Sequence, residues 1–155
     1  MRGYKAWFAL IAVLAFWGCE RKIDLNPHEV HWDRDMCIRC KMVVSERMYA
    51  VQTTDPSTGK TYYFDDIGCT ILWFVEDEIE WADKAKIWVT DVKTGEWIDA
   101  RTAKWSTMSV TPMAFGYAAH KPGTEPKDTE IIAYDEMVKR AIALEARKKK
   151  YGDTQ

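Results

Sequence analysis

The sequence lacks the motifs of hydrolytic and phosphate-transfer chemistry. It contains no Gly-X-Ser-X-Gly nucleophile elbow, no His-Glu-X-X-His zinc-protease motif and no glycine-rich phosphate loop. It also lacks an excess of charge of either sign, since 22 basic and 24 acidic residues leave a formal net charge of −2. A nucleic-acid-binding domain typically carries a clustered basic excess, so we expect no nucleic-acid partner. Because no nucleophile and base stand out together, we expect no enzymatic activity.

Long apolar runs are also scarce, and the longest one lies at the N-terminus. Residues 6–18 are uncharged and mostly apolar, and they follow a start that carries Arg2 and Lys5. A basic start, a short apolar run and a small final residue are typical of a secretory signal, whereas a membrane-spanning helix needs about 20 apolar residues. We therefore predict a signal peptide over residues 1–18. An uncleaved anchor is the alternative.

Cys19 directly follows this run, after Ala-Phe-Trp-Gly. A cysteine at this place resembles the lipobox of bacterial lipoproteins, in which the cysteine is acylated and becomes the first mature residue. The resemblance implies a chain held to a membrane surface in the cell envelope by a lipid on Cys19, facing the periplasm or the exterior. A signal without lipidation is the alternative. The polar residues 19–35 are predicted to form the tether.

Cysteine is rare, and only Cys37, Cys40 and Cys69 remain after the predicted lipid site. Cysteines outside the cytoplasm are usually paired, so an odd number indicates a free thiol or another use. The clearest motif is Cys37-X-X-Cys40-X-Met42, which brings three sulfur atoms close together along the chain. Thiolates and thioethers are soft ligands that favour Cu(I). A c-type haem is excluded, because Lys41 stands where its attachment motif requires histidine.

Three other interpretations of this motif stay open. His28 and His31 lie just upstream and would complete a Cys2His2 zinc site. A Cys-X-X-Cys pair also suits a thiol–disulfide oxidoreductase, although here it follows a polar segment and not a strand of a βαβ unit. The third interpretation is a structural disulfide between Cys37 and Cys40.

Other candidate residues carry weaker signals on their own. Cys69 lies in an apolar stretch and is predicted to be a small buried hydrophobic residue, and Met113 alone would be core filler. His120 is expected at the exposed end of a strand, where it is a further candidate ligand. The pair Asp65-Asp66 is expected to cap a helix, which is a structural role.

The order of predicted elements indicates an α+β fold. β-branched and aromatic residues flank two turn sequences, Asp-Pro-Ser-Thr-Gly and Lys-Thr-Gly, and so predict two antiparallel hairpins. The first hairpin is followed by a predicted helix over residues 67–78, and a last helix is predicted from Asp135 to about Lys149. The remaining strands are expected at 104–110, 114–120 and 130–134.

The two hairpins resemble each other. Thr54-Asp55 and Thr58-Gly59 in the first match Thr90-Asp91 and Thr94-Gly95 in the second, and each hairpin ends in an acidic residue where a helix is expected to start. We therefore predict a metal-binding domain over residues 36–155, made of two small ββαβ-like lobes at roughly 36–80 and 81–155, plus the C-terminal helix. With only two copies, a chance similarity is the alternative.

Four sequence blocks occur together in a familiar order. They are Cys37-X-X-Cys40-X-Met42, Tyr62-Tyr-Phe-Asp-Asp-Ile-Gly-Cys69, Val89-Thr-Asp-Val-Lys-Thr-Gly-Glu-Trp-Ile-Asp-Ala100 and Thr111-Pro-Met113. This set resembles the NosL-type proteins, the accessory lipoproteins of nitrous oxide reductase. The similarity covers roughly residues 35–116.

The resemblance implies a monomeric lipoprotein that binds one Cu(I) per chain and delivers it to the machinery of copper-enzyme assembly. The ligands that it implies are Cys37, Cys40, Met42 and Met113. Lys41 departs from the family pattern, which has glycine there, and the chain after His120 does not follow the usual ending of the family.

Overall fold

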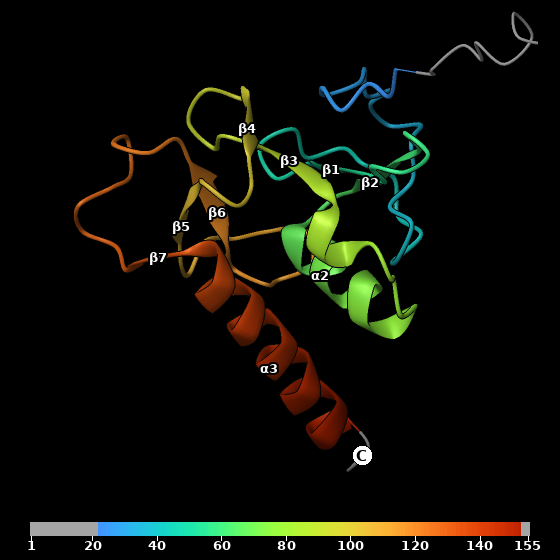
Figure 1. Cartoon of the computed structure of the whole chain (residues 1–155). Coiled ribbons are helices and arrows are strands. Elements are labelled where there is room, and N and C mark those ends of the chain that lie inside the picture. The colour runs from blue at the N-terminus through green and yellow to red at the C-terminus, as the bar shows by residue number, and fades with distance from the viewer. Residues whose placement is uncertain (1–21, 153–155) are drawn as a thin grey trace, which may run out of the picture.

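The computed structural model describes residues 22–152 and shows an α+β fold (Figure 1). Two small antiparallel sheets have the strand orders β2-β1-β3-β4 and β6-β5-β7. The predicted class, with antiparallel hairpins and a C-terminal helix, is confirmed. The predicted signal over residues 1–18 and the predicted lipid site at Cys19 lie outside the described residues.

The helices and strands have well-defined bounds. The strands are β1 (Val51–Thr54), β2 (Thr61–Phe64), β3 (Lys86–Thr90), β4 (Trp97–Asp99), β5 (Lys104–Ser106), β6 (Ala118–His120) and β7 (Ile131–Ile132). The helices are α2 (Ile67–Glu76), the 3-10 turn η1 (Ala82–Lys84) and α3 (Tyr134–Gly152). Both predicted hairpins and both predicted long helices are therefore present, with ends that differ by a few residues from the expected ones.

The turns of the two hairpins have the same geometry. Between β1 and β2, the Gly59 N–H donates to the Asp55 carbonyl at 2.8 Å, and between β3 and β4 the Gly95 N–H donates to the Asp91 carbonyl at 2.8 Å. The φ angles of Gly59 and Gly95 are 75° and 74°. A left-handed backbone is easy for glycine because it has no Cβ, which explains the glycine in both turns.

The two hairpins form one continuous sheet. β1 pairs with β3 in an antiparallel register that places Val51 opposite Val89, so the sheet crosses the predicted lobe boundary near residue 80. The helix start expected after the second hairpin is wrong. The Asp99 carboxylate accepts the backbone N–H of Arg101 at 2.8 Å, and this turn leads directly into β5. Burial of Trp105 on β5, which is 1% exposed, favours the strand at this point.

The predicted tether is docked on the outer face of the four-stranded sheet. Tyr63, Gln52 and Trp88 stand side by side across β2, β1 and β3. The Gln52 amide exchanges two 2.8 Å hydrogen bonds with the backbone of His28, and the Trp88 indole donates to the Leu25 carbonyl at 2.7 Å. The part of the predicted tether from Leu25 to His28 is therefore fixed to the sheet, because these polar side chains pair with its backbone.

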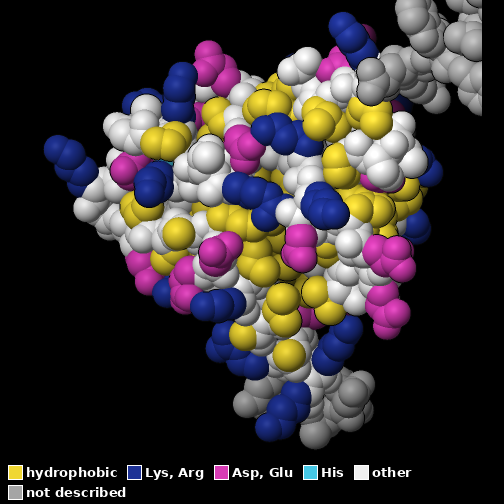
Figure 2. All heavy atoms as spheres, in the orientation of Figure 1, with side chains coloured by type: hydrophobic (Ala, Val, Ile, Leu, Met, Phe, Trp, Pro, Cys, Tyr) yellow, Lys and Arg dark blue, Asp and Glu magenta, His cyan; other side chains and the backbone are white. Residues whose placement is uncertain are grey.

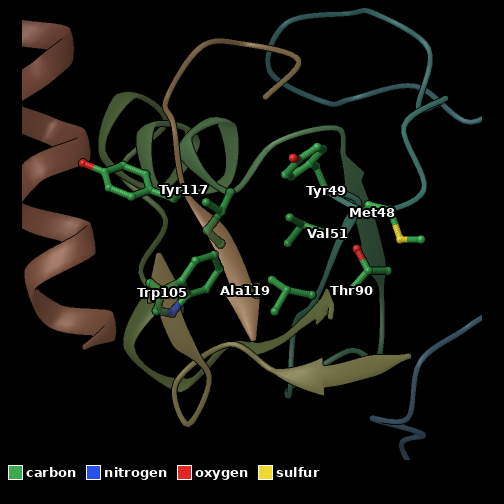
Figure 3. A pocket seen from close by; sticks show the side chains of 9 residues that line it. Met48, Tyr49, Val51, Thr90, Trp105, Tyr117 and Ala119 are labelled. Carbon is green, nitrogen blue, oxygen red and sulfur yellow. The ribbon is translucent and has the colours of Figure 1, made fainter. Parts of the chain in front are cut away.

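The main core lies between the inner face of the four-stranded sheet, the second sheet and the two helices. Its largest fully buried apolar side chains are Trp105, Phe64, Ile87 and Met137. A cavity of about 10 Å³ remains between the two sheets, lined in part by Val51, Thr90, Trp105 and Ala119 (Figure 3). Such a volume is about the size that one water molecule occupies, so the core is close-packed.

The surface mixes both signs of charge. On the face shown in Figure 2, basic and acidic side chains alternate, with apolar side chains visible between them. Within residues 22–152, neither α2 nor α3 is long and apolar enough to cross a lipid bilayer.

Candidate metal centre

The Cys-X-X-Cys motif forms a tight turn. The Cys37 N–H donates to the Met42 carbonyl at 2.8 Å, and the Lys41 N–H donates to the Cys37 carbonyl at 3.0 Å. An antiparallel bridge between Met36 and Val43 closes the turn at its base. Lys41 has a φ of 62°, a left-handed conformation in which glycine would be unstrained. The turn thereby brings Cys37 and Cys40 to the same side of the loop.

The second half of the site comes from the junction of β2 and α2. Asp66 is the N-cap of α2, and its carboxylate accepts the Gly68 N–H at 3.0 Å, which confirms the predicted cap. Asp65 precedes this cap, and Cys69 is the third residue of the helix. The sharp change of direction at the cap brings both Asp65 and Cys69 to the cysteine turn.

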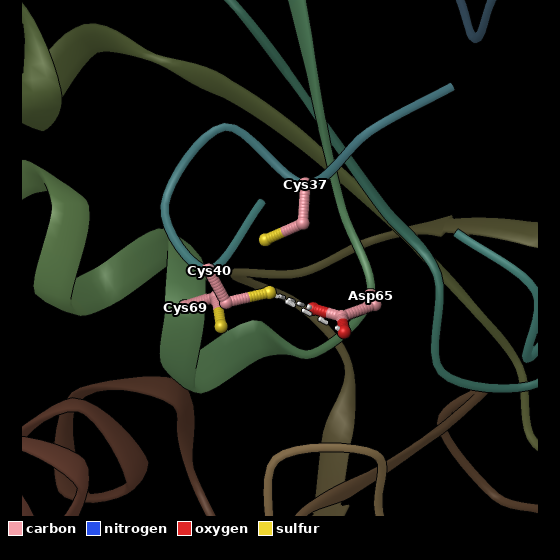
Figure 4. Close-up of side chains that lie close together, drawn as sticks. All are labelled: Cys37, Cys40, Asp65 and Cys69. Carbon is pink, nitrogen blue, oxygen red and sulfur yellow. Dashed lines mark hydrogen bonds between the residues drawn. The ribbon is translucent and has the colours of Figure 1, made fainter. Parts of the chain in front are cut away.

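Four side chains converge at this place (Figure 4). The sulfur atoms of Cys37, Cys40 and Cys69 and a carboxylate oxygen of Asp65 all lie within 4.8 Å of one another. All three thiols are free, and the Cys40 sulfur lies 3.5 Å from Asp65 Oδ1. A thiolate binds a metal at about 2.3 Å, so two thiolates on opposite sides of one ion are about 4.6 Å apart. The cluster is therefore of the right size and chemistry to hold a metal ion.

The three thiols differ in acidity because they are so close together. The neighbouring Cys69 thiol and, more weakly, the backbone N–H groups of Cys40 and Asp65 lower the pKa of Cys37 to about 6. Burial, together with the nearby Cys37 and Asp65, raises the pKa of Cys40 to about 12. The pKa of Cys69 is also raised, chiefly because its hydrogen bond supports the thiolate of Cys37. Near neutral pH the metal-free cluster therefore contains one thiolate and two thiols.

The cluster is closed on one side and open on the other. Cys37 and Cys69 are fully buried, whereas Cys40 is partly exposed. Met42 is 53% exposed and lies at the rim of a hollow of about 230 Å³ that Asp65 also lines. The other residues that line the hollow are Val43, Ser45, Glu46 and Pro112. Asp65 is the one residue that the hollow shares with the cluster, and the three cysteines are not among the residues that line it.

The Thr111-Pro112-Met113 loop is fastened beside the cluster by the helix cap. The Thr111 hydroxyl donates to Asp66 Oδ2 at 2.6 Å, and the Met113 N–H donates to the same oxygen at 3.2 Å. Burial raises the pKa of Asp66, and these hydrogen bonds oppose that effect. The Met113 side chain packs against the main core and is partly buried. Asp66 thus connects a third segment of the chain to the site.

The predicted histidine ligands lie elsewhere. His120 is 7% exposed, so its predicted exposure is wrong, and its Nε2 lies 2.9 Å from the Ser106 hydroxyl within the second sheet. The ring of His31 pairs with Asp35 at 3.4 Å. His28, His31 and His120 are all outside the cluster, so the described residues do not form the Cys2His2 zinc site that was the alternative interpretation of the motif.

Sequence reasoning found half of the cluster. It identified Cys37 and Cys40, and it placed Met42 in the same motif. It assigned Asp65 to a cap and Cys69 to the core, and both belong to the cluster. The available signal was the short spacing from Asp65 to Cys69 across a helix start, since a cysteine in the first turn of a helix often has functional chemistry.

Comparison with known proteins does not identify a family. No protein-family model matches this chain, and no curated protein matches it significantly. The resemblance to the NosL-type proteins therefore remains a prediction from the four sequence blocks.

Proposed function

We propose that this chain is a copper carrier that binds one Cu(I) ion and passes it to another protein. The observation that carries this proposal is the convergence of the Cys37, Cys40 and Cys69 thiols in a cluster with one open side. Thiolates are soft ligands, and Cu(I) is the commonly available ion that prefers them at low coordination number. Met42 lines the same hollow as Asp65 and is the candidate for a fourth soft ligand.

The arrangement of the sequence blocks supports the same proposal. Cys40 from the first block contacts Asp65 from the second, and Cys69 ends that second block. Thr111 from the last block is bonded to Asp66 of the second. The remaining block covers the end of β3, the turn after it and β4. Three blocks that are far apart in sequence thus surround one site, as expected of a motif that serves one function.

The differing exposure of the thiols suits transfer by ligand exchange. The buried Cys37 and Cys69 would hold the ion, while the partly exposed Cys40 and Met42 can be replaced by an incoming ligand. Binding requires loss of the Cys40 and Cys69 protons, because only thiolates ligate. In the metal-free cluster the Cys40 thiol donates to Asp65 Oδ1 at 3.5 Å, so this hydrogen bond is given up when the proton leaves.

The cellular context is part of the proposal. A signal over residues 1–18 and a lipid on Cys19 would place the carrier in the cell envelope, at a membrane surface. The NosL-like blocks point to delivery of copper to the assembly of a copper enzyme such as nitrous oxide reductase. Loss of membrane association in Cys19→Ser would support the anchor, and unchanged association would favour an uncleaved apolar segment.

Zinc is the second candidate cargo, and Asp65 is the observation that favours it. Three thiolates and one carboxylate are a ligand set that tetrahedral Zn²⁺ accepts. A third interpretation, thiol–disulfide exchange, is favoured by the lowered pKa of Cys37 but opposed by its complete burial, since an attacking thiolate must reach its substrate. Reduction of insulin by the protein would favour that interpretation.

Anaerobic titration of the reduced protein tests the proposal. Cu(I) and Zn²⁺ are each titrated against a chromophoric chelator of known affinity. We expect one tight equivalent of Cu(I), which is lost in Cys37→Ser and weakened in Met42→Leu. Met108→Leu is the matched control, because Met108 is 94% exposed and is not among the residues that line the hollow. Tighter binding of Zn²⁺ would favour the second cargo, and absence of binding would refute both.

A further inference from the structure

Arg39 extends from the cysteine turn to both long helices. Its Nε donates to Glu76 Oε2 at 2.8 Å and its Nη2 to Glu76 Oε1 at 3.1 Å, at the end of α2. The same Nη2 donates to Glu145 Oε1 of α3 at 3.2 Å. The Arg39 side chain is only 18% exposed. A forked, half-buried guanidinium of this kind is held more firmly than a surface ion pair.

The same end of α3 also holds the segment beside the helix cap. The Lys148 ammonium lies 4.8 Å from the centre of the Phe115 ring. That ring is packed so closely on Gly68 that a Cβ there would lie 2.1 Å from it. Gly68 directly precedes Cys69. Residues 145–149 of α3 therefore support both halves of the metal centre, one through Arg39 and the other through Phe115.

This end of α3 is held mainly by charge. Met137 and Ala141 are fully buried, and Leu144, one turn further on, is only partly buried. Beyond Leu144, the contacts to the rest of the protein include the Glu145 and Lys149 ion pairs and the Lys148 contact with Phe115. Contacts of this kind are weakened by salt and yield more easily than a packed core.

We propose that residues 145–149 of α3 act through Arg39 as a latch that sets the rate at which the metal leaves the cluster. This inference rests on the proposed function. Arg39 lies between Cys37 and Cys40, so its contact with Glu145 fixes the backbone that carries both thiols. While the latch is closed, the cysteine turn stays against Asp65 and Cys69. When the contact is lost, the turn moves more freely and the ion exchanges faster. Arg39 is a positioning residue and not a ligand.

Release kinetics of the full chain loaded with Cu(I) test the latch. An excess of a chromophoric Cu(I) chelator removes the ion, and the rate is followed by absorbance. We expect Glu145→Gln to release copper about tenfold faster, which corresponds to about 1.4 kcal/mol at the barrier. Arg140→Gln is the control, because it breaks a comparable ion pair of α3, with Glu130 and Glu136, away from the cysteine turn.

Two further measurements, the salt dependence of release and the rate of thiol alkylation, distinguish a positioning role of Arg39 from a general loss of structure. Added NaCl should speed release from the wild type and from Arg140→Gln, but much less from Glu145→Gln, in which the contact is already lost. In the metal-free protein, alkylation of the partly exposed Cys40 should be faster in Glu145→Gln than in the control. This second measurement needs no metal.

The outcomes are distinguishable. Equal rates of release and of Cys40 alkylation in Glu145→Gln and Arg140→Gln would overturn the latch. A wild type that takes up no Cu(I) would refute the proposed function, and the alkylation rates would then decide on the latch alone. Arg39→Gln loses the contacts with both Glu76 and Glu145 and should release copper at least as fast as Glu145→Gln. If Arg39→Gln does not fold, Glu145→Gln still decides, because glutamine keeps the size of the glutamate side chain and removes only its charge.

Discussion

The hairpin of β1 and β2 and the hairpin of β3 and β4 make the same turn at two different places in the chain. In both, an aspartate side chain accepts the backbone N–H two residues later, from Ser57 to Asp55 at 2.8 Å and from Lys93 to Asp91 at 2.7 Å. Each turn then ends in Thr-Gly with the glycine in the left-handed conformation. Local sequence thus determines the turn almost completely.

The segments that come after the two hairpins differ. After β2, Asp66 caps a helix and Cys69 lies in its first turn, next to the cysteine loop. After β4, the aspartate at the corresponding place, Asp99, pairs with Lys86 and leads into a strand. The comparison shows that the candidate metal centre does not come from the repeated turn. It comes from the cap and the cysteine that only the first unit has.

The largest expected effect is the loss of Cys69. We expect Cys69→Ser to weaken Cu(I) binding by more than about 100-fold, since even loss of an outer-shell partner costs roughly 10–100-fold. Ala103 lies four residues after Asp99, as Cys69 lies four after Asp65. The double variant Cys69→Ser/Ala103→Cys restores the number of thiols and should not restore binding. Restored affinity in the chelator competition would contradict the assigned site.

Removal of the Asp66 carboxylate should be the next largest effect. Asp66 is 1% exposed and accepts hydrogen bonds from Gly68, Thr111 and Met113. Asp66→Ala leaves buried donors without partners, so we expect a loss of about 2–3 kcal/mol in the free energy of unfolding. Asp99→Ala should lower the free energy of unfolding by only about 1 kcal/mol, because Asp99 is half-exposed. Urea denaturation measures the free energy of unfolding of both variants. Equal losses in Asp66→Ala and Asp99→Ala would contradict the difference between the segments that follow the two hairpins.

The pH dependence of copper binding should change slope near the pKa of Cys37. Between about pH 6 and 9, Cys37 is already a thiolate, and binding releases the protons of Cys40 and Cys69. Below about pH 6, Cys37 must also lose a proton, so the affinity should fall about tenfold more per pH unit. Chelator competition from pH 5 to 8 measures the slope. A constant slope through pH 6 would contradict the lowered pKa of Cys37.

The smallest expected effect tests the equivalence of the two turns. Gly59→Ala and Gly95→Ala each place a Cβ on a left-handed backbone, at a cost of about 1 kcal/mol. A Cβ at Gly59 meets Ile23 at 3.1 Å, and one at Gly95 meets the Met48 sulfur at 3.7 Å, so Gly59→Ala should be slightly worse. Thermal unfolding gives both values. A large difference would show that the turns are alike in shape but not in energy.

The parts of the fold that sequence reasoning predicted are local. The Thr-Gly turns, the cap at Asp66 and the cysteine turn each depend on residues that are adjacent in the chain. The pairing of β1 with β3 was not predicted, because either hairpin could pair at either edge. The docking of Leu25 and His28 was also missed, since a polar segment carries no apolar pattern to indicate burial.

The candidate metal centre likewise has a local part, which the sequence predicts, and a part that depends on contact between distant segments. Cys37 and Cys40 were found because their spacing is a local motif. Asp65 and Cys69 have an ordinary local explanation, as a residue before a cap and as a small apolar residue in a helix, and each is consistent with its sequence surroundings. Only the contact between two distant segments shows that they belong to a cluster that could hold a metal ion. Side chains that serve both structure and binding are the ones that sequence patterns assign to structure alone.

The hydrogen bond from the Ile38 N–H to the Tyr63 carbonyl, 3.1 Å long, has a consequence for solubility. β2 is an edge strand of the four-stranded sheet, and an uncovered edge is a template on which other chains can add strands. The cysteine turn covers part of this edge. Damage that unfolds the turn, such as over-oxidation of its thiols, therefore removes the candidate ligands and also exposes the unpaired edge of β2. An exposed edge strand favours aggregation.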